Sequence, residues 1–296
     1  MNQHKKLGLV TVLYNSPDVL SDFFISISLQ EYTNFHLFIV DNSSTPESLN
    51  LCKTLSTKYS IPASFIDNKG KNLGVAAGNN QGIEQALIEN CDVVTLINND
   101  LIFLDTKVFS RIYESLNTGE KLVSPLILDY PAGMIWYAGG YFDELRGVAP
   151  HINAGNAPFS PSNYRKYYSY APTCFLAIDK QVFDEVGLMD EDYFVYYDDT
   201  DFLYRCSSKG LYVYLNTDAV ISHKVSSSTG GDLSTFGVYY LTRNRLFFIR
   251  KNLKFPYRFV SIFYTLLSRT IKALLSKRNF RNAFFRGMYD GLKGIK

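Results

Sequence analysis

Residues 198–201 read Asp-Asp-Thr-Asp and place three carboxylates within four positions, directly after a tyrosine pair at 196–197. Because like charges at this spacing repel one another, such a cluster costs stability unless a cation, a basic partner or a proton-transfer task offsets the repulsion. A further acid, Asp100, follows the apolar segment 93–97 through Asn98 and Asn99. Together, the two acidic segments predict a metal-assisted transfer enzyme with a carboxylate base.

The acidic cluster also fits the start of a helix. Asp201 and Arg205 have the i,i+4 spacing of a helical ion pair. Asp198 and Asp199 would lie in the first turn, where the helix dipole favours negative charge. This structural role explains Asp201, but it does not explain three acids after a tyrosine pair.

The elements that must position these residues alternate in the first hundred residues. Continuous apolar runs predict buried strands, and the segments between them predict helices, the first with Ser16 as N-cap and Pro17 in its first turn. The expected strands are 7–14, 36–40, 63–66 and 93–97, and the expected helices are 17–30, 46–59 and 75–89. This order predicts a parallel sheet with right-handed crossovers, helices on both faces and ligands at the carboxyl ends of the strands.

The second part of the chain has a mixed pattern, with Gly/Pro/Asn-rich loops between 132 and 172. Helices are expected at 106–116, 180–186 and 199–208, and strands at 173–178, 211–215 and 220–222. A flexible connector at 226–231 then leads to three helical segments with a break near 254–256.

Polar residues follow the predicted strands. Asp41 ends the second strand and can accept hydrogen bonds from a nucleobase or ribose, although an acid there could also cap the next helix. Asn72 and Gly74 form a turn whose backbone can approach a ligand, or an ordinary loop-to-helix turn, since glycine tolerates positive φ. Gly78 and Gly82 recur at i,i+4 and predict close packing of a helix on the sheet.

Four segments occur in the same order as in a known family: 10–15 (VTVLYN), 40–44 (VDNSS), 72–82 (NLGVAAGNNQG) and 96–100 (LINND). They resemble the nucleotide-sugar half of inverting family 2 glycosyltransferases with the GT-A fold. The segment 198–205, then His223, then 239–244 (YYLTRN) resemble the rhamnosyltransferase-like branch of that family. The resemblance covers nearly the whole chain, and its ordered set of motifs is more specific than any one motif.

The resemblance implies a Rossmann-like mixed α/β sheet with helices on both faces, plus a C-terminal helical extension. It divides the chain into a catalytic domain at 1–225, with a nucleotide-sugar half at 1–104 and an acceptor half at 105–225, and a basic extension at 226–296. It implies Asp199 as the catalytic base, with Asp198 as the alternative. The implied donor-binding residues are Thr11, Tyr14, Asn15, Asp41, Asn72, Gly74, Asn98, Asn99 and Arg243.

A divalent cation, Mg²⁺ or Mn²⁺, is also implied. Asn98-Asn99-Asp100 takes the place of the Asp-x-Asp signature of the family, so Asp100 is the single anionic ligand there. One carboxylate with diphosphate oxygens and water is a normal arrangement for these hard ions. By resemblance, His223 is a second metal ligand or a diphosphate contact, although a lone histidine is more often structural. His4, His36 and His151 have no comparable context.

Composition and charge limit the class of protein. With 46% hydrophobic and 20% charged residues, the chain is an ordinary globular one. The four cysteines are widely spaced, which argues against a thiolate metal cluster, and we expect reduced thiols, no signal peptide, no membrane-spanning segment and a cytosolic protein. From 243 to 296, 14 Lys/Arg accompany the single acid Asp290, a net charge of +13.

The segment 257–276 reads as an amphipathic helix within this basic tail. Such a helix fits an interface with anionic lipid, and it also fits packing against the catalytic domain or a sister subunit in a homodimer. Nucleic-acid binding is less expected, because no recognised module accompanies the charge.

The predicted function is transfer of a sugar from a nucleoside-diphosphate sugar to a hydroxyl of a lipid-linked glycan in bacterial O-antigen or capsule assembly, peripheral on the inner face of the cell membrane. The resemblance favours dTDP-L-rhamnose as donor. A UDP-sugar donor (galactose, galactofuranose or N-acetylglucosamine) and a non-catalytic scaffold that binds nucleotide sugars and membranes are the alternatives. A dinucleotide oxidoreductase and a P-loop nucleotidase are disfavoured, because neither GxGxxG nor GxxxxGK[ST] is present.

Overall fold

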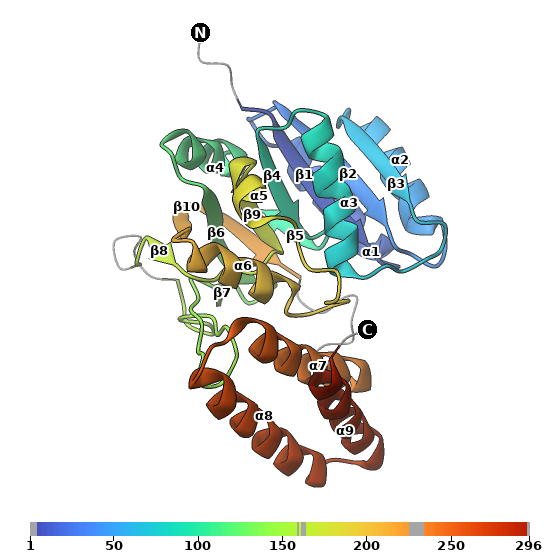
Figure 1. Ribbon diagram of the computed structural model, residues 1–296. Coiled ribbons are helices and arrows are strands. Elements are labelled where there is room, and N and C mark those ends of the chain that lie inside the picture. The colour runs from blue at the N-terminus through green and yellow to red at the C-terminus, as the bar shows by residue number, and fades with distance from the viewer. Residues whose placement is uncertain (1–4, 159, 161–163, 225–233, 295–296) are drawn as a thin grey trace.

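The computed structural model describes residues 5–158, 160, 164–224 and 234–294. It consists of a mixed sheet covered by helices and, below it, a layer of three C-terminal helices (Figure 1). The predicted connector at 226–231 lies outside the described residues.

Among these residues, ten strands form one sheet with the order β3-β2-β1-β4-β9-β6-β10-β5, and β7 and β8 pair at its side. Strands β3, β2, β1 and β4 are parallel, as predicted, whereas β9 runs antiparallel to β4 and β6. The strands are β1 (Leu7–Leu13), β2 (Phe35–Asp41), β3 (Ala63–Asp67), β4 (Val93–Ile97), β5 (Leu101–Phe103), β6 (Leu122–Asp129), β7 (Ile135–Tyr137), β8 (Tyr167–Tyr168), β9 (Phe175–Asp179) and β10 (Val213–His223).

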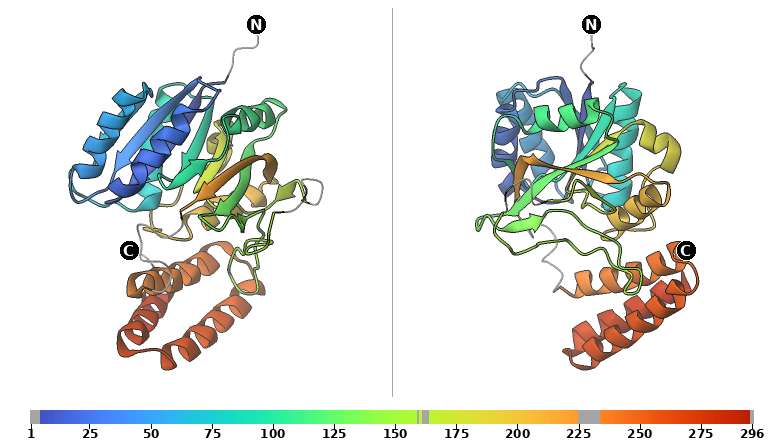
Figure 2. Two further views of the ribbon diagram at one scale, coloured as in Figure 1. Left: turned by 180° about the vertical axis from the view of Figure 1, so that it is seen from behind. Right: turned by 90° about the vertical axis from the view of Figure 1, so that its left-hand side faces the viewer.

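Helices cover both faces of the sheet, with α3, α5 and α6 on one face and α1, α2 and α4 on the other (Figures 1 and 2). The predicted α/β fold with a C-terminal helical extension is therefore confirmed. The helices are α1 (Pro17–Ser28), α2 (Glu47–Lys58), α3 (Val75–Ile88), α4 (Val108–Asn117), α5 (Gln181–Val186), α6 (Asp198–Ser208), α7 (Thr235–Asn252), α8 (Tyr257–Leu274) and α9 (Arg278–Lys293).

Two local predictions differ from the structure. Ser16 stands at the N-cap of α1, but its hydroxyl accepts a hydrogen bond from Asn99 instead of capping the helix. The two strands expected at 211–215 and 220–222 form the single strand β10, whose pairing with β6 is irregular between Asn216 and Val220. Asn216 Oδ1 accepts the backbone N–H groups of Asp218 and Ala219, so a polar bulge looked like a turn in the sequence.

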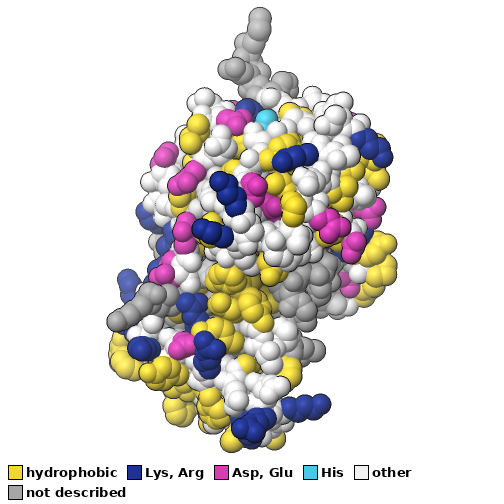
Figure 3. Space-filling view, turned by 90° about the vertical axis from the view of Figure 1, so that its right-hand side faces the viewer, with side chains coloured by type: hydrophobic (Ala, Val, Ile, Leu, Met, Phe, Trp, Pro, Cys, Tyr) yellow, Lys and Arg dark blue, Asp and Glu magenta, His cyan; other side chains and the backbone are white. Residues whose placement is uncertain are grey.

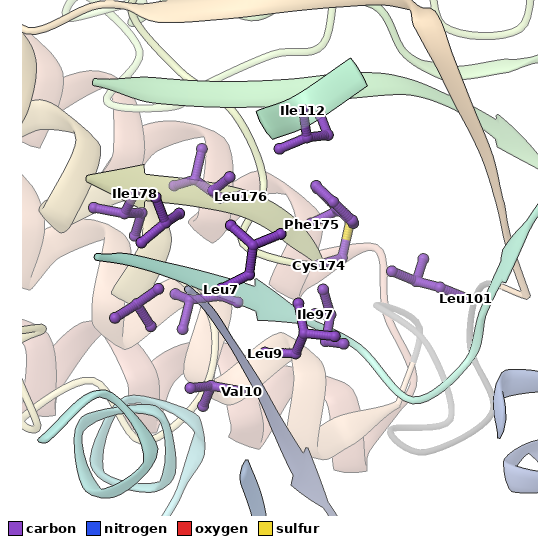
Figure 4. Close-up of a cluster of buried hydrophobic side chains, with 14 of the residues drawn as sticks. Leu7, Leu9, Val10, Ile97, Leu101, Ile112, Cys174, Phe175, Leu176 and Ile178 are labelled. Carbon is purple, nitrogen blue, oxygen red and sulfur yellow. The ribbon is translucent and has the colours of Figure 1, made fainter. Parts of the chain in front are cut away.

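The core lies between the sheet and its helices, where Leu9 of β1, Ile97 of β4 and Leu176 of β9 pack together (Figure 4). Helix α3 approaches β1 closely through the two glycines predicted for that role. A Cβ atom at Gly82 would lie 2.3 Å from Val10, and one at Gly78 would lie 2.9 Å from Val12. This packing holds the start of α3 against the strand ends.

The C-terminal helices dock through α7. The predicted Asp201–Arg205 ion pair is present at 2.8 Å, and the same carboxylate accepts a hydrogen bond from Asn252 and pairs with Lys251. Asp201 is fully buried, so these bonds compensate the loss of its hydration. Within the described residues, none of the helices is both long enough and apolar enough to cross a membrane.

Candidate active site

The pairing of β5 with β10 brings Asp100 and His223 together. The antiparallel register sets His223 opposite Leu101, the residue after Asp100. His223 Nε2 then lies 3.1 Å from Asp100 Oδ1, and both side chains are buried. Although the two atoms are within ion-pair distance, Asp100 Oδ1 has no hydrogen bond of good geometry.

The environment of His223 favours its charged form. Burial alone would lower the pKa of its imidazole, but its contacts with Cys174 and Asp100 raise that pKa to about 10. Burial raises the pKa of the Cys174 thiol, which favours its neutral form.

This pair of residues fits a divalent cation. The buried Asp100 Oδ1, which has no aligned donor, is available as a ligand, and the neighbouring His223 Nε2 would become a second ligand once a bound cation displaced its proton. Within the described ranges, no cluster of three or more His, Cys, Asp or Glu side chains could hold a metal ion by itself. A cation at this pair would therefore take its remaining ligands from phosphate oxygens and water.

The second part of the site is the start of α6. Asp199 Oδ2 accepts a hydrogen bond from the Tyr170 hydroxyl at 2.7 Å, and Asp199 Oδ1 accepts the Thr200 N–H at 2.6 Å. Burial raises the pKa of Asp199, although these donors act in the opposite direction. For Asp198, burial and then repulsion from Asp199 raise the pKa to about 8.

The two carboxyl groups thus titrate as a pair. Asp198 is the more deeply buried of the two and holds its proton at neutral pH. Burial raises the pKa of Asp199 and makes it a stronger base than a surface aspartate, while the donors Tyr170 and Thr200 stabilise its charged form.

The backbone before these acids adopts an unusual conformation. Tyr196 and Tyr197 have φ values of 62° and 67°, in the left-handed region that costs energy for residues other than glycine. The buried Asn244 side chain of α7 donates to the carbonyls of Val195 and Tyr196 at 2.8 and 2.9 Å, and the Tyr197 hydroxyl donates to the Gly147 carbonyl. These bonds stabilise the turn at 196–197, which sets the position of Asp198 and Asp199 directly after it.

Three residues that the sequence did not single out connect the two parts of the site. The Trp136 ring contacts the His223 ring at 4.7 Å and the His151 ring at 4.8 Å between centroids. The His151 ring lies 5.9 Å from the ring of Tyr170, which binds Asp199. In the sequence, His151 has no context comparable to that of His223, because it lies in an irregular loop whose glycines and prolines carry no periodic signal.

Asp41, Asn15 and Asn99 surround the ends of β1 and β2. Asn15 accepts the Ser44 N–H through Oδ1, and Asp41 Oδ1 accepts the Ser43 N–H, each at 3.0 Å. Asn99 donates to Ser16 at 2.7 Å and so joins the loop that carries Asp100 to the loop after β1. The strand-end polar residues therefore form one connected surface, as the parallel register requires.

Gly74 has a packing role. Its φ is 90°, and a Cβ atom there would lie 2.5 Å from the Phe194 carbonyl oxygen. Asn72 Oδ1 accepts the Gly74 N–H at 2.9 Å and shapes the turn. The glycine thus lets the start of α3 approach the segment that precedes the acidic cluster.

The other predicted donor-binding residues have different surroundings. Thr11 is buried within β1, Tyr14 is exposed, and Asn98 is exposed with its backbone N–H bound to Cys174. Arg243 donates to the Asp192 carbonyl at 3.3 Å and to Asn244 Oδ1 at 2.8 Å. Its contacts are therefore with α7 and the 190–197 segment.

Sequence relatives of this chain are sugar transferases. The low-salt glycan biosynthesis hexosyltransferase Agl10 of Haloferax volcanii is 27% identical over 288 residues, which cover 92% of this chain and 84% of that protein. The dTDP-rhamnosyl transferase RfbF of Shigella flexneri is 25% identical over 306 residues, covering 97% and 95%.

The fold is that of a solved glycosyltransferase. The mannosyltransferase PcManGT of Pyrobaculum calidifontis, solved with GDP-Man and Mn²⁺, matches with a TM-score of 0.60 at 11% identity, covering 99% of this chain and 87% of that one. The model of the family described as glycosyl transferase family 2 matches residues 9–187. This chain therefore belongs to glycosyl transferase family 2 and has the GT-A fold.

Proposed function

We propose that the protein is an inverting glycosyltransferase that uses a nucleoside-diphosphate sugar and has Asp199 as its base. The observation that supports this most is the pair of coupled carboxyl groups at the start of α6, joined to the Asp100–His223 pair through Trp136 and His151. The start of α6 would provide the base, and the Asp100–His223 pair would hold the cation that binds the diphosphate.

In the proposed reaction, Asp199 Oδ removes the proton of an acceptor hydroxyl. The acceptor oxygen attacks the anomeric carbon from the face opposite the diphosphate, so the new C–O bond forms as the bond to the diphosphate breaks and the configuration inverts. When bound, Mg²⁺ or Mn²⁺ supplies positive charge to the diphosphate. Asp100 and His223 would hold the cation, while the polar surface around Asp41 and Asn15 would bind the nucleoside.

The donor that we favour is dTDP-L-rhamnose. The similarity to a dTDP-rhamnosyl transferase over nearly the full length of both chains supports this choice. A UDP-sugar is the second candidate, and the similarity to a hexosyltransferase is compatible with a hexose such as galactose as the transferred sugar. The name of Agl10 supports a role in glycan biosynthesis. As acceptor we propose a lipid-linked glycan of the O-antigen or capsule type.

The packing of α8 supports a membrane location. Ser261 and Thr265 face the protein and are fully buried, whereas Phe263 is 70% and Leu274 65% exposed. A helix on a water-exposed surface has the opposite arrangement, with its apolar side inward. Figure 3 shows hydrophobic and basic side chains together on the helical part of the molecule.

Exposed basic residues flank the apolar face at Arg258, Lys272, Lys277 and Arg278. Apolar side chains with flanking cations are the pattern of a helix that lies on anionic lipid. We therefore propose that the protein binds the inner face of the cell membrane, where a lipid-linked acceptor would be located. The alternative is that the apolar face of α8 packs against a sister subunit in a homodimer.

Calorimetry tests the donor class. We expect binding of dTDP or UDP that strengthens with Mn²⁺, because the cation would join the Asp100–His223 pair to the diphosphate, and no binding of NAD. Binding of NAD, or of neither diphosphate, would contradict the proposal. Hydrolysis of a panel of nucleotide sugars then identifies the donor.

A further inference from the structure

A cavity lies near the candidate active site, next to Phe142, whose ring contacts that of Tyr170. It measures about 600 Å³, within the range of small-molecule sites, roughly 300–1,000 Å³. Its aromatic lining consists of Tyr141, Phe142, Tyr204, Tyr212 and Tyr257, and we call it the tyrosine pocket. Its walls come from the 141–145 loop, the C-terminal half of α6 and the first residue of α8, elements that lie above and below one another in Figure 1.

The chemistry of the tyrosine pocket fits a neutral ligand that is rich in hydroxyls. Asp143 and Glu144 line it, and no lysine or arginine belongs to the lining that the structure describes. A diphosphate would therefore be repelled there. Ser207 and Ser208 donate to the Tyr204 carbonyl, and their oxygens remain able to accept hydrogen bonds.

The aromatic rings add the apolar part of such a site. Tyr141, Tyr212 and Tyr257 are 48%, 50% and 43% exposed, so their faces are available without a rearrangement of the core. A sugar ring presents C–H groups on its faces and hydroxyls around its edge, and flat aromatic faces combined with carboxylates and hydroxyls complement both. Tyr204 is already oriented, since its hydroxyl donates to Glu144 at 2.7 Å.

The position of the tyrosine pocket connects two features of the molecule. The Phe142 ring in its wall lies 5.9 Å from the ring of Tyr170, which donates to Asp199. On its other side, Tyr257 begins α8, the helix with the outward apolar face. The pocket therefore lies between the candidate base and the proposed membrane surface.

We propose that the tyrosine pocket is a carbohydrate subsite that holds an interior sugar of the acceptor glycan, away from the hydroxyl that receives the new sugar. This inference rests on the proposed function, because it assigns the acceptor of the same reaction. It makes the enzyme selective for acceptors longer than one sugar.

A glycan array tests the inference directly. The full chain, saturated with Mn²⁺ and with dTDP or UDP, whichever binds in the calorimetry, is applied to immobilised mono- and oligosaccharides that contain rhamnose, galactose or N-acetylglucosamine. We expect binding to oligosaccharides, and a loss of about tenfold in affinity for the double variant Tyr141→Ala/Tyr212→Ala. Because both side chains are half exposed, this variant should fold.

Tyr167→Ala is the matched control, since Tyr167 is equally exposed but bonds to Glu120 outside the pocket. Unchanged binding by the double variant, or no oligosaccharide binding by the wild type, would overturn the inference. The outcome is separable from that of the proposed function. Donor hydrolysis without oligosaccharide binding removes the subsite alone, and oligosaccharide binding through the tyrosines without nucleotide binding removes the transferase proposal alone.

Discussion

The sheet region and helix α8 bury opposite kinds of residue. In the sheet region, the strands are apolar inside. Several polar groups around the candidate active site have partners, as Asp199 has in Tyr170 and Asn99 in Ser16, whereas Asp100 Oδ1 has none of good geometry. In α8, the inward residues Ser261 and Thr265 have hydroxyls with no hydrogen-bond partner, while the large apolar side chains point outward.

We relate this difference to the membrane location proposed above. Burial of apolar side chains stabilises a fold surrounded by water, and the sheet region follows that rule. Helix α8 instead uses small inward residues to approach its neighbours: a Cβ atom at Gly147 would lie 2.7 Å from Ser261 Oγ. Its apolar side chains remain free to enter a phase other than water. Substitutions in the sheet region and in α8 test this contrast.

The largest effect is expected at the strand ends. Asp100→Ala should lower kcat/KM by about 10²–10³, the usual cost of removing one electrostatic group from a transition-state site. Asp67→Ala is the control, because Asp67 ends β3 at the same edge of the sheet but bonds only to the Lys69 N–H. Equal activity of the two variants would mean that Asp100 contributes no more to catalysis than another aspartate at this edge of the sheet.

The pH dependence of stability probes the buried pair of acids. The pKa of Asp198 is raised to about 8 in the folded state from 3.8, so the folded protein holds a proton that the unfolded chain has lost. The free energy of unfolding should therefore fall as pH rises from about 4 to about 8, by at most about 1.4 kcal/mol per pH unit. Asp198→Asn should flatten this fall, as measured by urea unfolding across the range. An unaltered slope in the variant would contradict the assignment of the buried proton to Asp198.

A smaller effect is expected at α8. Phe263→Ser/Leu267→Ser should weaken binding to phosphatidylglycerol liposomes by about tenfold, because two apolar side chains would no longer enter the lipid. Ile88→Ser on α3 is the control, since Ile88 is 71% exposed in the sheet region. Unchanged liposome binding together with the loss of a dimer in the double variant would assign the face to a sister subunit.

The sequence was informative where a pattern is periodic or a motif is ordered. The four parallel strands and the helices between them follow from apolar runs, and their register brings Asp41, Asn15 and Asn99 to one edge. The contact between Asp100 and His223 could be inferred only through the resemblance, because it depends on the pairing of β5 with β10 across more than a hundred residues.

Other features leave no local signal. Trp136 lies in the three-residue strand β7, and His151 and Tyr170 lie in loops. Only the folded structure places the three between His223 and Asp199. The amphipathic pattern of α8 was visible in the sequence. The pattern is the same whether the apolar face of the helix packs against the protein or points away from it. Which side faces the protein is decided by the contacts of Ser261 and Thr265 with their neighbours.

The most direct test of the account is the turnover of Asp199→Asn. The variant keeps the shape of the side chain but cannot take a proton, so kcat should fall by about 10²–10⁴, while the affinity for the nucleotide sugar stays that of the wild type. Sugar transfer to an acceptor and donor binding by calorimetry measure the two quantities. Turnover close to that of the wild type would show that another group is the base and would contradict the account.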